Sequence, residues 1–409
     1  MKIAIVHPYP VSERAVGGTT RVYLLARHLA ARHSVRILTH ASGDPIADAA
    51  AVRAMADLGV AQEIFARPRA TVGRKLAWAL GHAPYFVGHN RNPALEAALA
   101  RLDATDELDV VHVEFAYLAP VLGALGPRPA RVLAEQETMS VVVERLHAVP
   151  SRRLSLYQVY LSRQLAGVRR FEAQAVRTFD RAFAINEAEA ALLSRVAGRE
   201  VAVLPHVVAA DAFRAPAAEP REPVLLFVGN YAHDPNRHAV LWFAESVWPR
   251  VCEEAGDAAL AVVGPHLPPA EALELARRGA RLLGRVDDLA DCYRRATVFV
   301  NPILSGGGMR GKVLEAFASG RPVVSTRLGM EGIAAEDGVH ADLADDAVAF
   351  ARAVVRLLRD PELRRQRGRA ARALVEQLYD APSVFGRLED AYRDAVAERL
   401  ARLTADRVA

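Results

Sequence analysis

Three consecutive glycines, two cations and one carboxylate lie together in the segment SGGGMRGKVLEAF, residues 305–317. The consecutive glycines are Gly306, Gly307 and Gly308. A glycine-rich loop that leads into an apolar helix offers backbone N–H groups and a positive helix end to an anion. Arg310 and Lys312 add positive charge at a spacing that suits a diphosphate. The segment therefore predicts a phosphate-binding site, with Glu315 as its single carboxylate.

The lysine in this segment is informative because the chain otherwise uses arginine. Of 52 lysines and arginines, only Lys2, Lys75 and Lys312 are lysines. An ammonium is a compact point charge, whereas a guanidinium is a broad planar fork. A lysine beside the glycine loop therefore indicates that the predicted phosphate site requires a compact positive charge.

A second glycine loop, Gly17-Gly18, follows the opening strand-like run and precedes a helical pattern from Thr19. On its own this pair is more typical of a tight turn than of a phosphate site. Neither loop matches the dinucleotide fingerprint or the P-loop, which disfavours hydride transfer and nucleotide hydrolysis. The sequence also lacks an Asp-x-Asp pair that would hold a divalent cation on a diphosphate. We therefore expect no metal and no cofactor, with charge neutralised by Arg310, Lys312 and the helix dipole.

Composition narrows the class of protein. The 409 residues are 52% hydrophobic and 24% charged, which suits a globular chain with two domains. The net charge of +4 is spread along the chain, so no nucleic-acid partner is expected. The longest apolar stretch, residues 115–126, contains Pro120 and is too short to span a membrane. Two cysteines and the lack of a leader pattern predict a cytoplasmic protein.

Strand-like and helix-like patterns alternate along the whole chain. Buried-strand patterns occur at 2–9, 34–40, 109–115, 130–136, 181–186 and 200–207, and then at 223–231, 258–265, 280–286, 296–303 and 321–327. This alternation predicts an α/β fold with parallel sheets covered by helices. We expect two tandem Rossmann-like domains with a cleft between them.

The expected domains are residues 1–208 and 223–380, joined by an Ala- and Pro-rich linker at 209–222. Residues 381–409 form one amphipathic pattern after the second domain. That helix either closes the second domain or crosses back to the first.

The second half of the chain resembles a known family. The segments FVGNYAHDPNRHAVLWFAESVWPRV and LLGRVDDLADCYRRATVFVNPILSGGGMRGKVLEAFASGRPVVSTRLGMEGI are similar to the nucleotide-binding half of the retaining, two-domain glycosyltransferases of group 1, or family four. The first half agrees more loosely through its glycine loop, DVVHVEF and INEAEAALLSRVAGREVAVLPHVV. The resemblance implies the GT-B architecture, with the acceptor on the first domain and a nucleotide sugar on the second.

The resemblance also implies roles for individual residues. Glu315 would bond the ribose hydroxyls, while Arg310 and Lys312 would lie near the diphosphate and assist its departure. His112 would orient the transferred sugar, although a lone histidine of this kind is usually structural. The remaining donor-binding residues that the resemblance implies are Gly17, Gly18, Asn230, Arg285, Val286, Gly306, Gly307 and Gly308.

The sequence departs from the family pattern in two places. Many relatives have a second glutamate eight positions before Glu315, where this chain has Gly307. The arginine and lysine that often follow the first strand of the second domain are absent from FVGNYAHDPN. We hypothesise that Arg310 and Lys312 replace those missing cations. In the family, the departing phosphate is thought to help deprotonate the acceptor, so no protein nucleophile is required.

Three carboxylates in the first half are candidates for contact with the acceptor. Glu114, Glu135 and Glu137 follow strand-like runs, although solvated loop carboxylates are the alternative. Arginines that alternate with apolar residues at 67–80 and 152–181 predict possible peripheral contact with anionic lipid. A solvated basic helix is the alternative for these segments.

The sequence thus predicts an enzyme that transfers a hexose-type sugar from a nucleotide-diphosphate sugar to a hydroxyl acceptor, with retention and without a metal. Two alternatives stay open: a nucleotide-sugar 2-epimerase and a non-catalytic subunit that binds sugar nucleotides. The sugar, the base and the acceptor are not identified by any motif.

Overall fold

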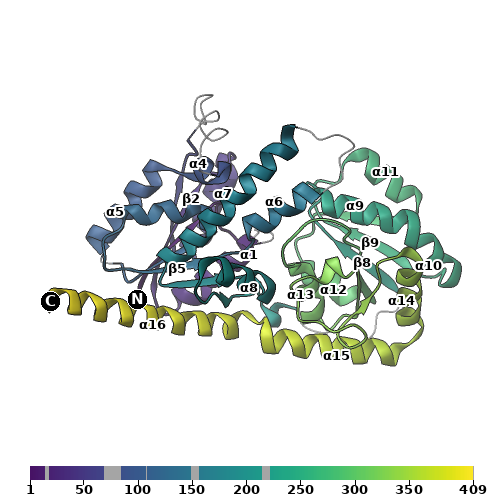
Figure 1. The fold of residues 1–409 in the computed structure, drawn as a ribbon. Helices are drawn as coiled ribbons and strands as arrows, with labels where there is room; N and C mark the ends of the chain where they lie inside the picture. The colour runs from purple at the N-terminus through teal and green to yellow at the C-terminus, as the bar shows by residue number, and fades with distance from the viewer. Residues whose placement is uncertain (14–17, 69–83, 107, 149–155, 214–221, 409) are drawn as a thin grey trace. The chain divides into compact units, whose positions relative to one another are not determined.

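The computed structural model describes residues 1–13, 18–68, 84–106, 108–148, 156–213 and 222–408. The chain forms two compact units, each built around its own parallel sheet (Figure 1). Unit 1 comprises Met1–His206 and Val384–Ala409, and unit 2 comprises Val207–Ser383. Two Rossmann-like domains were expected, and the fold confirms them.

The sheet of unit 1 has the strand order β3-β2-β1-β4-β5-β6-β7, and all of its pairs are parallel. Its strands are β1 (Lys2–His7), β2 (Ser34–His40), β3 (Ala61–Phe65), β4 (Val110–Glu114), β5 (Ala130–Ala134), β6 (Arg181–Ala184) and β7 (Ala202–Val203). The chain builds outward from β1 to β3 and then returns to the other side of β1 for β4. In such sheets the crevice at the carboxyl ends of the two strands at this switch point is the usual ligand site.

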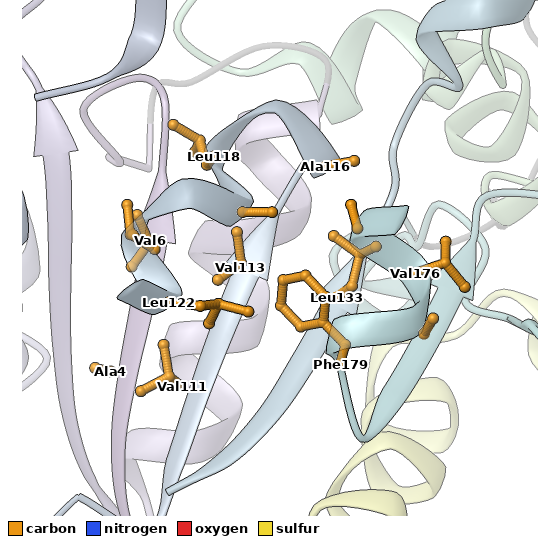
Figure 2. Close-up of a cluster of buried hydrophobic side chains, with 14 of the residues drawn as sticks. Ala4, Val6, Val111, Val113, Ala116, Leu118, Leu122, Leu133, Val176 and Phe179 are labelled. Atoms are coloured by element: carbon orange, nitrogen blue, oxygen red, sulfur yellow. The ribbon is translucent and has the colours of Figure 1, made fainter. Parts of the chain in front are cut away.

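The central strand β4 has different side chains on its two faces. Successive side chains along a strand point to opposite faces. Val111 and Val113 face an apolar cluster that includes Leu122 and Phe179, as Figure 2 shows. His112 and Glu114 therefore point to the other face, and both are fully buried. A polar pair is thus placed inside unit 1 by a strand that is otherwise apolar.

Helices connect the strands of unit 1. They are α1 (Gly18–Ala30), α2 (Pro45–Ala56), α4 (Tyr85–Asn90), α5 (Pro93–Asp106), the 3₁₀ helix η1 (Ala116–Ala124), α6 (Met139–Ala148), α7 (Leu156–Thr178) and α8 (Glu187–Ala197). The residues at both ends of α8 explain where this helix begins and ends. The side chain of Asn186 caps its start by accepting from the Glu189 N–H, and Gly198 ends it in the left-handed conformation.

The sheet of unit 2 has the order β10-β9-β8-β11-β12-β13, again with parallel pairs, and its switch point lies between β8 and β11. Its strands are β8 (Val224–Val228), β9 (Ala259–Val263), β10 (Ala280–Gly284), β11 (Val298–Asn301), β12 (Val323–Ser325) and β13 (Asp342–Leu343). Both faces of β8 are covered, because Leu225 and Phe227 pack into one apolar cluster and Leu226 into another.

The helices of unit 2 supply those two clusters. They are η2 (Ala210–Ala212), α9 (Asp234–Trp242), the π-helical turn η3 (Phe243–Val247), α10 (Trp248–Glu254), α11 (Pro269–Arg277), α12 (Leu289–Arg295), α13 (Gly311–Ala318), η4 (Leu328–Met330), α14 (Ala347–Arg359) and α15 (Pro361–Leu378). The described part of the expected linker includes η2, in which Ala210 packs in the core of unit 2. Residues 214–221 of that linker lie outside the described residues.

The last helix, α16 (Ala381–Val408, yellow in Figure 1), packs on unit 1 over most of its length. Its Glu389 is buried and accepts from Arg32 at 2.7 Å and from His33 at 3.0 Å. Near its end, Arg399 pairs with Asp180 at 3.1 Å. The C-terminal segment is therefore a structural part of the first domain.

All eleven predicted strand runs contain a strand, but two strands were not predicted. These are β3 and β13, and each lies at an edge of its sheet. Among the described helices, none combines the length and apolar character needed to cross a bilayer.

Candidate functional site

The glycine loop of unit 2 lies at the carboxyl end of β11, one of the two strands at the switch point. It leads directly into α13, whose first turn has no acidic residue. Gly306 and Gly308 have φ values of +96° and +77°, which favour glycine over any residue with a Cβ. A Cβ at Gly306 would also lie 3.1 Å from Cγ of Pro235. The loop conformation therefore depends on at least two of its three glycines.

Arg310 folds back onto this loop. Its Nη1 donates to the carbonyl oxygens of Gly307 and Gly308. The guanidinium thus helps to hold the glycine loop in place just before α13. Its predicted contact with a diphosphate stays a prediction.

Lys312 reaches from α13 to the end of β8, the other strand at the switch point. Its Nζ donates to the carbonyl oxygen of Val228 at 3.1 Å and to Oδ1 of Asn236 at 2.8 Å. It also lies 4.4 Å from the ring centroid of Phe227. The Lys312 ammonium thus lies beside the segment FVGNYAHDPN, which has no lysine or arginine of its own. That Lys312 replaces the missing cations stays a prediction.

The surroundings of Lys312 disfavour its charged form. Burial lowers its pKa to about 7, and the neighbouring charge of Arg310 adds to this effect, while Glu315 partly opposes it. Near neutral pH, the free protein therefore contains both forms of Lys312. An anion beside the ammonium would favour the charged form.

Glu315 is held by a tyrosine from the preceding helix. The Tyr293 hydroxyl donates to Oε2 of Glu315 at 2.8 Å, and the carbonyl oxygen of Lys312 lies 3.0 Å from the same hydroxyl. Burial raises the pKa of Glu315, while Tyr293 and Lys312 act in the opposite direction. The carboxylate is therefore fixed in one orientation, which suits the binding of a hydroxyl pair.

The other predicted donor residues of unit 2 surround the same two strand ends or follow β10. Asn230 follows β8, and its carbonyl oxygen accepts from Nδ2 of Asn236 at 2.9 Å. Asn236 thus connects the β8 loop to Lys312. Arg285 is exposed directly after β10, while Val286 packs against the core of the unit.

The predicted residues of unit 1 also lie at a switch point, but in its interior. His112 is fully buried, with Nε2 3.1 Å from Oε1 of Glu114 and Nδ1 2.7 Å from the hydroxyl of Tyr392. Glu114 is also fully buried and accepts from Nη2 of Arg21 at 2.7 Å. Gly18 begins α1, whereas Gly17 lies outside the described residues. The predicted role of His112 toward the sugar stays a prediction.

The acceptor candidates Glu135 and Glu137 follow β5. Glu135 is 1% exposed and accepts from the Ala116 N–H at 2.7 Å. Burial raises its pKa well above the ordinary value, and the nearby charge of Glu172 adds to this. Glu137 keeps part of its surface exposed. Glu114 and Glu135 are therefore interior groups rather than solvated loop carboxylates, and acceptor contact stays a prediction for all three.

The two arginine-rich segments, 67–80 and 152–181, lie only partly within the described residues. Of the first, Arg67 is described and lies with its guanidinium 5.4 Å from the ring centroid of Tyr9, while residues 69–80 lie outside the described part. In the second, Arg169, Arg170 and Arg177 line an open groove of about 700 Å³ between α7 and α8. Within the described residues, no three His, Cys, Asp or Glu side chains form a group that could hold a metal ion.

The structure thus brings Lys312, Glu315, Asn230 and the glycine loop to the carboxyl ends of the central strands β8 and β11 of unit 2. We call this end of the sheet the β8–β11 edge. Sequence reasoning missed Asn236 and Tyr293, which orient Lys312 and Glu315. Asn236 had no recognisable signal, and Tyr293 occupies an apolar position of a short helix that suggests only packing.

A match to a known protein family lies within the second unit. Residues 222–360 match the family model described as Glycosyl transferases group 1. The matched region contains the glycine loop and the whole of α13. The chain is 27% identical over 170 residues to an uncharacterized 44.6 kDa protein in the cps region of Klebsiella pneumoniae, covering 39% of this chain and 44% of that protein.

A second relative is the D-inositol 3-phosphate glycosyltransferase of Acidothermus cellulolyticus, with 41% identity over 116 residues. That match covers 28% of this chain and 25% of the relative. The chain therefore spans less than half the length of the curated relatives it matches.

Solved structures match the fold over nearly the whole chain. Sucrose-phosphate synthase from Thermosynechococcus elongatus has a TM-score of 0.69 at 19% identity, covering 97% of this chain and 99% of that one. Anabaena Alr3699/HepE in complex with UDP and glucose has a TM-score of 0.66 at 13% identity, covering 96% and 100%. The fold is therefore the GT-B architecture, and the match to the group 1 glycosyltransferase model lies within its second unit.

Proposed function

We propose that this protein transfers a sugar from a nucleotide-diphosphate sugar to a hydroxyl acceptor, with retention of anomeric configuration and without a metal ion. The observation that carries the proposal is the position of Lys312. Its ammonium lies at the end of β8, beside the strand that leads into the glycine loop and one helical turn from Glu315. The β8–β11 edge of unit 2 thus combines an ammonium suited to a diphosphate with a carboxylate suited to a ribose.

The donor would be bound by charge and backbone together. The N–H groups at the start of α13 and the Lys312 ammonium would stabilise the diphosphate. Glu315, held by Tyr293, would accept from the ribose hydroxyls. Asn230, Arg285 and Val286 would complete the donor site. Since the similar Anabaena structure contains UDP and glucose, UDP-glucose is the first donor to test.

Lys312 would also act in the chemical step. Breaking the sugar–phosphate bond leaves negative charge on the departing diphosphate, and a fixed cation stabilises that charge as it develops. A departing phosphate oxygen would take the proton from the acceptor hydroxyl on the same face of the sugar. Retention then requires no protein nucleophile, and charge neutralisation by Lys312 and α13 requires no metal.

The first unit would supply the acceptor side. Gly18 would approach the donor sugar, His112 would act on its position from the interior of unit 1, and Glu137 is the acceptor candidate with exposed surface. The basic groove between α7 and α8 supports the proposal of peripheral contact with an anionic lipid surface. Salt-dependent binding to vesicles that contain anionic lipid would test this contact, and no binding at low salt would contradict it.

Water can replace an unidentified acceptor in the first experiment. UDP-glucose and other nucleotide sugars are incubated with the protein in EDTA, and the released sugar is followed by NMR before its anomers equilibrate. The expected product is the free sugar with the donor's configuration, released more slowly by Lys312→Met and unchanged in Lys2→Met. The inverted anomer would refute retention.

The same spectra separate the alternative functions. An epimerised donor with intact nucleotide would indicate the 2-epimerase, since that enzyme acts without an acceptor. Donor-induced thermal stabilisation without any product, even with candidate acceptors, would indicate a binding subunit. Loss of turnover in EDTA that is restored by a divalent cation would refute the metal-independent mechanism.

A further inference from the structure

Within unit 1, a continuous line of buried hydrogen bonds runs from the C-terminal helix α16 to Gln136, whose side chain lies against the first residue of α1. It runs from Tyr392 to His112 at 2.7 Å and from His112 to Glu114 at 3.1 Å. From Glu114 it reaches Gln136, whose Nε2 donates to Oε2 at 2.7 Å. Tyr392, His112 and Glu114 are each fully buried.

The line ends against Gly18. If Gly18 had a Cβ, that atom would lie 1.7 Å from Oε1 of Gln136. The Gln136 side-chain carbonyl therefore fills the space where any other residue would place its side chain. The first residue of α1 thus rests on Gln136, whose amide is oriented by Glu114.

The protons in this line can be assigned from its partners. Burial, followed by the charge of Glu114, raises the pKa of Tyr392 well above its usual range, so its hydroxyl keeps its proton. His112 is the hydrogen-bond partner that the structure gives to this hydroxyl. The hydroxyl therefore donates to Nδ1, which leaves the His112 proton on Nε2 to be donated to Glu114.

The charges around the line support this assignment. Burial alone would raise the pKa of Glu114, but Arg21 and the bond from His112 hold it well below its usual range. Burial lowers the pKa of His7 and of His206 to about 4, so both neighbours are neutral at physiological pH. Glu114 and Arg21 thus form a charge-balanced pair inside unit 1.

The opposite tautomer would disrupt the line. With the proton on Nδ1, the Nε2 lone pair would face the Glu114 carboxylate, and the Tyr392 proton would lose its acceptor. Oε1 of Glu114 would then move away from His112, and the carboxylate, held only at Oε2 by Arg21, would rotate and change the position of Gln136. A single hydroxyl on α16 therefore affects how Gln136 meets Gly18.

We propose that Tyr392 is a positioning residue for sugar transfer: through His112 and Glu114 it fixes the Gln136 side chain on which Gly18 and the first turn of α1 rest. The inference rests on the proposed function, in which Gly18 and His112 serve the donor sugar. The C-terminal helix then acts on the reaction without touching the substrate. The chain segment that contributes this hydroxyl is 280 residues away from His112 in sequence.

The test combines a spectroscopic readout with kinetics on the full-length protein. In protein labelled with ¹⁵N-histidine, His112 is expected to show a protonated Nε2 and an unprotonated Nδ1. Tyr392→Phe removes the donor to Nδ1 and is expected to abolish this single-tautomer pattern. It is also expected to lower kcat for UDP-glucose turnover about 10-fold or more, while the dissociation constant for UDP-glucose changes less than twofold.

A matched control is Tyr379→Phe, which removes another buried tyrosine hydroxyl, one that accepts from the Ala334 N–H in unit 2. It should leave both the His112 spectrum and kcat unchanged. If Tyr392→Phe does not fold, Gln136→Met breaks the line at its other end and should lower kcat in the same way.

Two results would overturn the inference. One is a wild-type His112 that carries its proton on Nδ1 or on both nitrogens. The other is a Tyr392→Phe protein with an altered spectrum and an unchanged kcat. A protein with the expected spectrum but no turnover of any donor would instead refute the proposed function, so the two failures are distinguishable.

Discussion

The central prediction concerns Lys312→Met, which removes the ammonium from the end of β8. In the free protein the Lys312 Nζ is held by Val228 and Asn236, and its pKa is lowered to about 7. A hydrogen bond between charged partners contributes about 2–3 kcal/mol. Loss of that contact should weaken UDP-glucose binding about 30- to 150-fold.

Donor binding should also depend on pH through Lys312. A bound diphosphate favours the ammonium, so binding above pH 7 takes up a proton. Affinity should be constant below pH 7 and should fall by up to about tenfold per pH unit above it. It should level off at the affinity of Lys312→Met, because neutral lysine contributes no charge. The diphosphate of a nucleotide sugar is esterified at both ends, so neither phosphate titrates in this range.

Isothermal titration calorimetry at pH 6, 7, 8 and 9 measures both effects. Lys312→Met should bind weakly and with no pH dependence over this range. Lys2→Met, which removes an exposed lysine at the start of β1, should behave like the wild type. If Lys312→Met keeps the wild-type affinity, or keeps its pH dependence, the assignment of the ammonium to the diphosphate is wrong.

Three further predictions follow from other residues. Glu315→Gln should weaken donor binding about 10- to 100-fold, but should not affect a 2′,3′-dideoxy analogue, and equal losses for both ligands in calorimetry would contradict the ribose assignment. Gly306→Ala, at φ +96°, should cost about 1–2 kcal/mol and lower Tm by about 2–8 °C, whereas Gly386→Ala, whose added Cβ meets no atom within 4 Å, should not lower it. Burial raises the pKa of Glu135, so the native state keeps a proton that the unfolded chain releases, and stability should fall as pH rises above the ordinary value of 4.5. Glu135→Gln should therefore raise Tm more at pH 8 than at pH 5, and an equal change at both pH values would argue against a protonated Glu135.

The fold was predictable where the strands are buried on both faces. Runs such as KIAIVH and ALAVV are continuous and apolar because helices cover both sides of the sheet. The strand β3, with the sequence AQEIF, was missed because an edge strand has a neighbour on one side only and tolerates polar residues. The strand β13 was missed because its segment, HADLADD, has acidic residues in place of an apolar run.

The site was predictable only as far as the local sequence extends. Glycines, cations and a glutamate in one segment indicated a phosphate site next to a helix. The contact of Lys312 with the end of β8 joins residues 84 positions apart, and no local pattern encodes it. The same holds for Asn236 and Tyr293, which orient the two key side chains from other elements. Local chemistry therefore identifies the charged groups, whereas tertiary packing determines which atoms they face.

The most direct test of the account is a calorimetric titration of the wild-type protein, in EDTA, with a panel of uridine, guanosine, adenosine and thymidine diphosphate sugars. We expect saturable one-to-one binding of at least one of them, and loss of that binding in the Lys312→Met, Glu315→Gln double variant. Absence of binding for the whole panel, or equal affinity in the double variant, would contradict the assignment of a nucleotide-sugar site to the β8–β11 edge.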